Sequence, residues 1–193
     1  MPEEYIPKAF ISCSVRQEDK TFVEIVEQIV KDNGFEPMGT VGRHVNYAEP
    51  IPQSMIKEIK KADVLVMAAT PRYFQKERPF QRKKQKVISE MLHVESGMAI
   101  MDNIPVIVFA KEGTHVGNFI PGITQYFTIG KTLVDEQREK IKIIFNDTKK
   151  KVANKIDKEE GNYWKYIIER ILIVIGIIAI IRGMYKIIRK LIN

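Results

Sequence analysis

Two glutamates, Glu90 and Glu95, lie in a segment whose apolar residues follow a helical period. These apolar residues are spaced alternately by four and three, at Val87, Met91, Val94, Met98 and Met101. The spacing predicts an apolar stripe along one helix. At about 100° per residue, the two carboxylates fall on opposite borders of that stripe. A carboxylate at the rim of a buried face can lose part of its hydration and still reach a ligand, so both glutamates are candidates for chemistry.

Polar side chains follow the first and third predicted strands. Ser12, Ser14 and Arg16 come at the end of the first strand, where hydroxyls and backbone amides can hold a ribose or a phosphate. Ordinary turn chemistry would use the same residue types. Arg72 and Tyr73 follow the third strand, and the arginine is placed to meet a pyrophosphate.

Several common kinds of site lack support in the sequence. The three histidines show no metal-ligand spacing, and with a single cysteine a zinc site is not expected. No G-x-x-x-x-G-K, G-x-G-x-x-G or G-x-S-x-G motif occurs. The sequence therefore gives no support for a P-loop NTPase, a Rossmann-type dinucleotide-binding protein or an esterase. We therefore expect neither a metal nor a resident cofactor.

The elements that would position these residues alternate between strand and helix. Apolar runs predict five strands, at 9–13, 35–38, 63–69, 104–109 and 126–129. Helical spacing predicts helices at 22–30, 53–61 and 87–101. Strands that are apolar throughout are covered on both faces, which indicates a parallel sheet between helices. The expected fold is α/β: a flavodoxin-like, doubly wound, five-stranded parallel sheet followed by long C-terminal helices, with ligands bound at the carboxyl ends of the strands.

Composition divides the chain into three parts. We expect an α/β domain at 1–130, a charged helical connector at 131–161 and an apolar helix at 162–193. The net charge of +7 arises after residue 130, where 15 Lys and Arg outnumber 8 Asp and Glu and leave 16 residues of each sign before them. The main domain is therefore neutral, and nucleic acid is not an expected partner.

The last segment contains an uncharged run of eleven residues, 171–181, with aromatic residues near both ends. Aromatic side chains are favoured at membrane interfaces, so we expect residues 162–193 to form a membrane-associated or transmembrane helix that contacts lipid. More positive residues precede the run than follow it, and the first residues form no secretory signal. The main domain is then expected on the cytoplasmic side. An exposed oligomerisation helix is the alternative.

Three segments between residues 8 and 130 together resemble the TIR (Toll/interleukin receptor homology) domain family. Residues 9–14 (AFISCS) resemble the first box of the family, a strand followed by a polar turn. Residues 56–67 (IKEIKKADVLVM), with TPRY at 70–73, resemble the helix-to-strand step before the ligand site. Residues 92–95 (LHVE), with Ala99 and PVI at 105–107, resemble the segment that bears the catalytic glutamate.

The resemblance implies a flavodoxin-like fold and, as in many bacterial, archaeal and plant members, cleavage of the N-glycosidic bond of NAD. It favours Glu95 as the catalytic carboxylate, and Glu90 stays the second candidate. The expected substrate-binding residues are Ser12, Ser14, Arg16, Arg72 and Tyr73. Residues 95–99 also resemble the glutamate-glycine-alanine step of nucleoside deoxyribosyltransferases, which break an N-glycosidic bond as well.

The resemblance therefore predicts a membrane-anchored TIR-like effector that releases nicotinamide from NAD, in antiphage defence or a cell-suicide response. Such an effector is expected to self-associate through its TIR-like domain and to respond to a separate sensor protein or a nucleotide signal. Three alternatives stay open. They are a non-catalytic module for nucleotide binding or TIR–TIR contact, a membrane-disrupting effector, and an enzyme similar to nucleoside deoxyribosyltransferases.

Overall fold

A computed structural model describes residues 5–38, 51–75, 85–124, 126–130 and 133–192 of the chain. The chain divides into two compact units, Met1–Lys149 and Lys150–Asn193. The first unit contains the sheet and the candidate site. The second consists of the C-terminal part of one long helix, α5 (Asp135–Ile192).

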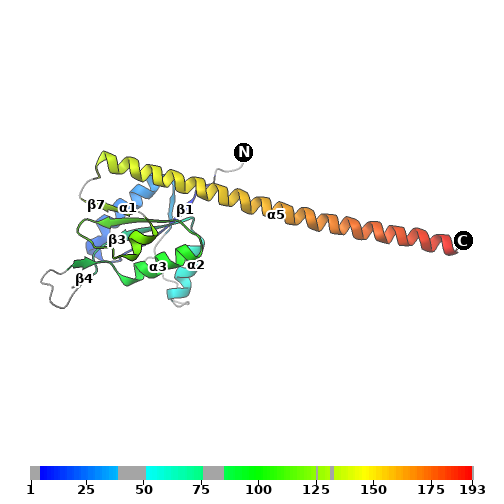
Figure 1. Cartoon of the computed structure of the whole chain (residues 1–193), viewed down its shortest axis with the longest axis horizontal. Coiled ribbons are helices and arrows are strands. Elements are labelled where there is room, and N and C mark those ends of the chain that lie inside the picture. Colours follow the sequence, from blue (N-terminus) through cyan, green and yellow to red (C-terminus); the bar gives the residue numbers. More distant parts are fainter. Residues whose placement is uncertain (1–4, 39–50, 76–84, 125, 131–132, 193) are drawn as a thin grey trace. The chain divides into compact units, whose positions relative to one another are not determined.

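Five parallel strands form the main sheet of the first unit (Figure 1). Their order across the sheet is β2-β1-β3-β6-β7. Their bounds are β1 (Lys8–Cys13), β2 (Glu36–Met38), β3 (Val64–Ala69), β6 (Val106–Lys111) and β7 (Tyr126–Ile129). This is the doubly wound, flavodoxin-like order, so the expected fold class is confirmed. A separate two-stranded antiparallel sheet pairs β4 (Tyr73–Gln75) with β5 (Gln85–Val87).

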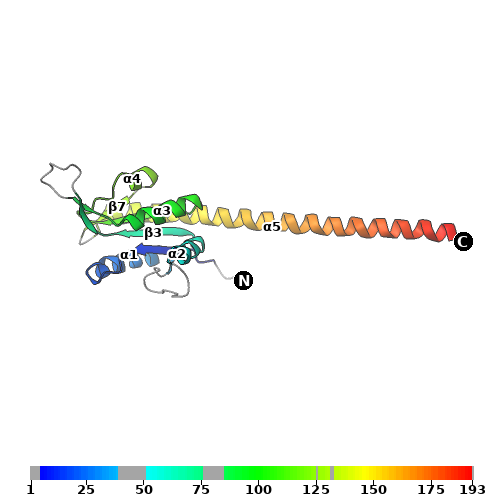
Figure 2. The same ribbon diagram turned by 90° about the horizontal axis from the view of Figure 1, so that it is seen from below.

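Helices cover both faces of the main sheet. One core cluster joins α1 (Lys20–Asp32) and the first turns of α5 to one face, around Phe109 and Phe145. The other joins α2 (Ile51–Lys60), α3 (Glu90–Met101) and α4 (Phe119–Ile123) to the opposite face. Figure 1 shows α1 on one side of the sheet and α2 and α3 on the other, and Figure 2 shows α4 beside α3. Burial on both faces explains why all six residues of β3 are apolar and buried.

The buried face of α3 differs from the predicted stripe. Met91 and Val94 are about half exposed, and Met101 is 85% exposed. The residues that face inward are Leu92, Glu95, Ser96 and Ala99. Ser96 and Ala99 are small, so α3 can approach the sheet closely along this face. Because apolar residues occur all round α3, their periodicity did not identify the face that packs, and the predicted stripe was wrong.

The first turns of α5 belong to the core of the first unit. Ile141 and Phe145 are fully buried there, and the Phe145 ring lies 5.2 Å from Phe35 and 6.3 Å from Phe109. The sequence placed domain boundaries after residues 130 and 161, whereas the two compact units meet between Lys149 and Lys150.

The C-terminal part of α5 corrects the expectation of a membrane anchor. In the portion of the chain that the structure describes, no helix is both long and apolar enough to cross a bilayer. A span needs about 20 predominantly apolar residues, whereas the uncharged run here has eleven and is flanked by Glu169, Arg170, Arg182 and Lys186. The predicted transmembrane helix and the membrane-associated localisation drawn from it were wrong.

Candidate functional site

A pocket of about 200 Å³ opens at the carboxyl ends of β1 and β3. Parallel strands end at the same edge of a sheet, so the loops that follow β1 and β3 meet there. The N-terminal half of α3 forms the remaining wall. The lining residues are Ser12, Cys13, Ser14, Val15, Thr70, Arg72, Tyr73, Ser89, Met91, Leu92 and Glu95.

Glu95 is the carboxylate of this pocket. It is only 8% exposed, on the inward face of α3. The hydroxyl of Ser12, itself buried at the end of β1, donates a hydrogen bond to Glu95 Oε2. Burial raises the pKa of Glu95 above its ordinary value of 4.5, while the Ser12 hydrogen bond acts in the opposite direction. The site thus holds a poorly hydrated carboxylate with one fixed donor.

The start of α3 places Glu95 at this edge. Ser89 is the N-cap residue, and its side chain accepts a hydrogen bond from the Met91 amide at 3.3 Å. Such a cap satisfies one of the free amides in the first helical turn. Because α3 begins beside the pocket, Glu95 in its second turn reaches the pocket wall.

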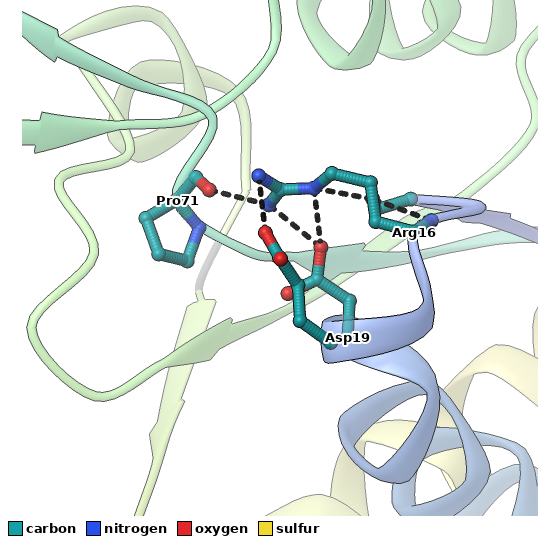
Figure 3. A network of polar contacts seen from close by, with 5 residues as sticks. Arg16, Asp19 and Pro71 are labelled. Atoms are coloured by element: carbon teal, nitrogen blue, oxygen red, sulfur yellow. Dashed lines mark hydrogen bonds and ion pairs between the residues drawn. The ribbon is translucent and has the colours of Figure 1, made fainter.

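A partly buried ion pair joins the two loops that line the pocket (Figure 3). Arg16 Nη2 lies 2.7 Å from Asp19 Oδ2 and donates to the Pro71 carbonyl at 2.6 Å. Arg16 Nε also donates to Asp19 Oδ2, at 2.9 Å. Asp19 is 2% exposed. The pair therefore links the loop after β1 to the loop after β3 and holds both in place.

The pKa of Asp19 reflects this network. Burial alone would raise it, but hydrogen bonds from Ser14, Arg16 and Thr70, together with the charge of Arg16, bring it below its ordinary value of 3.8. Two of these partners, Ser14 and Thr70, also line the pocket. Asp19 therefore stabilises the walls of the site as a carboxylate.

The structure brings together most of the residues predicted for the site. Ser12, Ser14, Arg72, Tyr73 and Glu95 line one pocket. Two predicted residues lie elsewhere. The guanidinium of Arg16 is bound to Asp19 and Pro71 and does not line the pocket. Glu90 is exposed at the first position of α3 and lines a second, neighbouring pocket.

Asp19 is the residue of the site region that sequence reasoning missed. The sequence indicates a polar turn after the first strand and makes Ser14 and Arg16 binding candidates, but it assigns no role to Asp19. The available signal was the spacing of three between Arg16 and Asp19, which places opposite charges together in a helical turn. Nothing in that spacing indicates that the pair is buried.

Among the residues with described positions, no cluster of three or more His, Cys, Asp or Glu side chains is arranged to hold a metal ion.

Comparisons with known proteins identify no family. No protein-family model matches the chain, and no curated protein matches it. Among solved structures, the CMP N-glycosidase BcmB of Clostridium botulinum matches 71% of this chain and 98% of its own, at 17% identity and a TM-score of 0.43. The Flv1 flavodiiron core of Synechocystis sp. PCC6803 matches 76% of this chain and 36% of its own, at 8% identity and a TM-score of 0.41. At these scores neither likeness carries an argument about function.

Proposed function

We propose that this chain cleaves the N-glycosidic bond of a nucleotide, with NAD as the substrate and Glu95 as the catalytic carboxylate. The observation that carries the proposal is the buried Glu95, held by Ser12 in the wall of a pocket at the carboxyl edge of the sheet. Resemblance of three sequence segments to TIR domains supports NAD as the nucleotide. It also supports self-association of the TIR-like domain and control by a sensor protein or a nucleotide signal.

The chemistry needs a negative charge beside the ribose. As the bond between C1′ and the nicotinamide nitrogen breaks, its electron pair leaves with the nicotinamide, and positive charge builds on the ribose. A nearby carboxylate stabilises this oxocarbenium-like state. Water then adds to C1′ and loses a proton. Because the departing nicotinamide takes up the electron pair as a neutral base, no general acid is required, and one carboxylate suffices.

The environment of Glu95 suits this role. A charge in a poorly hydrated site interacts more strongly with a developing cation than it would in water. Ser12 donates to one carboxylate oxygen only, and each oxygen has more than one lone pair with which to face a ligand. Arg72, a cation suited to a phosphate, also lines the pocket.

The test is nicotinamide release from NAD by the full chain at high concentration, compared with Glu95→Gln. We expect the substitution to lower kcat about 100-fold or more, the loss typical of removing one electrostatic stabiliser. Glu24→Gln is the matched control, because Glu24 is an exposed glutamate on α1 that does not line the pocket. Equal rates for wild type and Glu95→Gln would refute the assignment. A loss in Glu90→Gln alone would transfer it to Glu90. Saturable NAD binding without turnover would indicate a binding module.

A further inference from the structure

A second pocket, of about 460 Å³, adjoins the Glu95 pocket. It lies between strands β4 and β5, the first turn of α3 and the loop at 115–118. Tyr73 lines both pockets, so they meet at this one aromatic side chain. A ligand bound at Glu95 that extends past Tyr73 would enter the larger pocket.

Backbone hydrogen bonds fix the walls of the second pocket. The His115 amide donates to the Lys86 carbonyl at 2.7 Å, and the Ile88 amide donates to the His115 carbonyl at 3.3 Å. The Arg72 amide donates to the Val87 carbonyl at 2.7 Å. These bonds connect β5 to the 115–118 loop and to the rim of the Glu95 pocket. The second pocket is therefore formed without a ligand.

The side chains of this pocket suit a purine nucleoside. Tyr73 and Phe74 are exposed aromatic residues, and aromatic rings of this kind stack on bases. The amide of Asn118 both donates and accepts, the pattern that pairs with N6 and N7 of adenine. His115 adds a donor, because its Nδ1 accepts from the Gly117 amide at 3.1 Å, which leaves the proton of the neutral ring on Nε2.

The charges divide a dinucleotide between the two pockets. Glu90 lines the second pocket and would accept hydrogen bonds from ribose hydroxyls, as acidic residues do in other nucleotide sites. Its negative charge disfavours a phosphate there. Arg72, adjacent to the shared Tyr73, lines the first pocket and suits the pyrophosphate. The order base, ribose, phosphate then runs from the second pocket towards Glu95.

We propose that the second pocket binds the adenosine half of a dinucleotide whose other half is cleaved at Glu95. The inference rests on the proposed N-glycosidic cleavage. The proposal names the ligand class of the second pocket. Cleavage itself does not require that pocket, because nicotinamide mononucleotide has the same scissile bond and no adenosine.

The experiment compares NAD with nicotinamide mononucleotide for the full-length wild type, Phe74→Ala and Asn118→Ala. We expect kcat/KM for NAD to fall about tenfold to a hundredfold in each variant, the effect of losing one stacked or hydrogen-bonded base contact. The value for the mononucleotide should stay at the wild-type level. Tyr126→Ala, which removes an exposed aromatic side chain from β7 that lines neither pocket, is the control. Equal losses for both substrates would overturn the proposal.

Binding of AMP, measured by calorimetry, separates this proposal from the cleavage reaction. We expect AMP to bind wild type and Glu95→Gln alike, and to bind Phe74→Ala and Asn118→Ala at least tenfold more weakly. This result without any nicotinamide release would support the pocket assignment and refute the cleavage reaction. No AMP binding by wild type, or equal affinity for AMP and CMP, would overturn the pocket assignment whether or not NAD is cleaved.

Discussion

The Ser12 hydroxyl donates to the Glu95 carboxylate and so joins the end of β1 to the inward face of α3. The two residues are 83 positions apart in the chain, and both are buried. The contact exists because β1 ends where α3 begins, at the carboxyl edge of the sheet. It gives the carboxylate a fixed orientation towards the pocket.

Replacing Ser12 by alanine should slow NAD cleavage and change its pH dependence. The hydroxyl stabilises the ionised carboxylate, so its loss should raise the pKa of Glu95 and shift the rising limb of the rate to higher pH. A hydrogen bond to a charged group contributes about 1.5–3 kcal/mol, so we expect a 10- to 100-fold loss of kcat at neutral pH. The measurement is kcat for NAD between pH 5 and about pH 9.

Ser12→Thr keeps the hydroxyl and should restore most of the rate and the wild-type pH profile. A rate loss in Ser12→Ala with an unshifted profile would mean that Ser12 only supports the fold. That outcome would remove its role in orienting and ionising Glu95.

Glu95→Gln should make the folded chain more stable at neutral pH. Burial raises the pKa of Glu95 in the folded state, so the folded chain binds more protons than the unfolded chain from about pH 4.5 up to that raised pKa. Its free energy of unfolding therefore falls as pH rises through this window. Glutamine does not ionise, and we expect a gain of about 1 kcal/mol at pH 8 that disappears below pH 4. Urea unfolding at both pH values measures it, and a variant less stable than wild type at pH 8 would contradict it.

The strand pattern was sufficient to predict the sheet. Runs such as Val64–Ala69 are apolar at every position because both faces of the sheet are covered, and their alternation with helices gave the parallel order. The start of α5 could not be placed in the same way. Ile141 and Phe145 lie four residues apart in a charged helix, which predicts an apolar face but not the surface that it covers.

The site was predictable as an edge of the sheet but not as individual contacts. Loops that follow parallel strands must meet, so Ser12, Ser14 and Arg72 were expected together. The choice between Glu90 and Glu95 depended on which face of α3 packs inward. That face contains the small residues Ser96 and Ala99, whereas Met91 and Met101 of the predicted stripe are exposed. The burial of Asp19 depends on long-range packing that local spacing does not encode.

Asp19→Asn should destabilise the fold, because it removes the buried one of the two carboxylates that pair with the part-buried Arg16. Loss of one partner of a buried pair costs about 3–5 kcal/mol, and partial exposure of Arg16 reduces this to about 2–3 kcal/mol. The pKa of Asp19 is lowered in the folded state, so its contribution is present above pH 3.8 and is lost as pH falls through that lowered pKa. Urea unfolding at pH 7 should therefore show the full difference from wild type, and the difference should shrink as pH falls through that lowered pKa.

Glu18→Gln is the matched control, because Glu18 also pairs with Arg16 at 2.8 Å but is 69% exposed. Exposed pairs contribute about 0–1 kcal/mol. Similar losses in the two variants would mean that the burial of Asp19 does not set its contribution.

Phe145→Ala should test whether the first turns of α5 belong to the α/β unit. Phe145 is fully buried, stacks on Phe109 and meets the edge of Phe35. Truncating such a side chain leaves a cavity and costs about 3–5 kcal/mol, so the midpoint of urea unfolding should fall sharply. Ile143→Ala, two residues earlier on the same helix and 57% exposed, should cost less than about 1 kcal/mol. Phe145 and Ile143 should differ in this way only if the helix packs on the sheet. Equal losses of stability in the two variants would mean that the α/β domain ends near residue 130, as the sequence predicts.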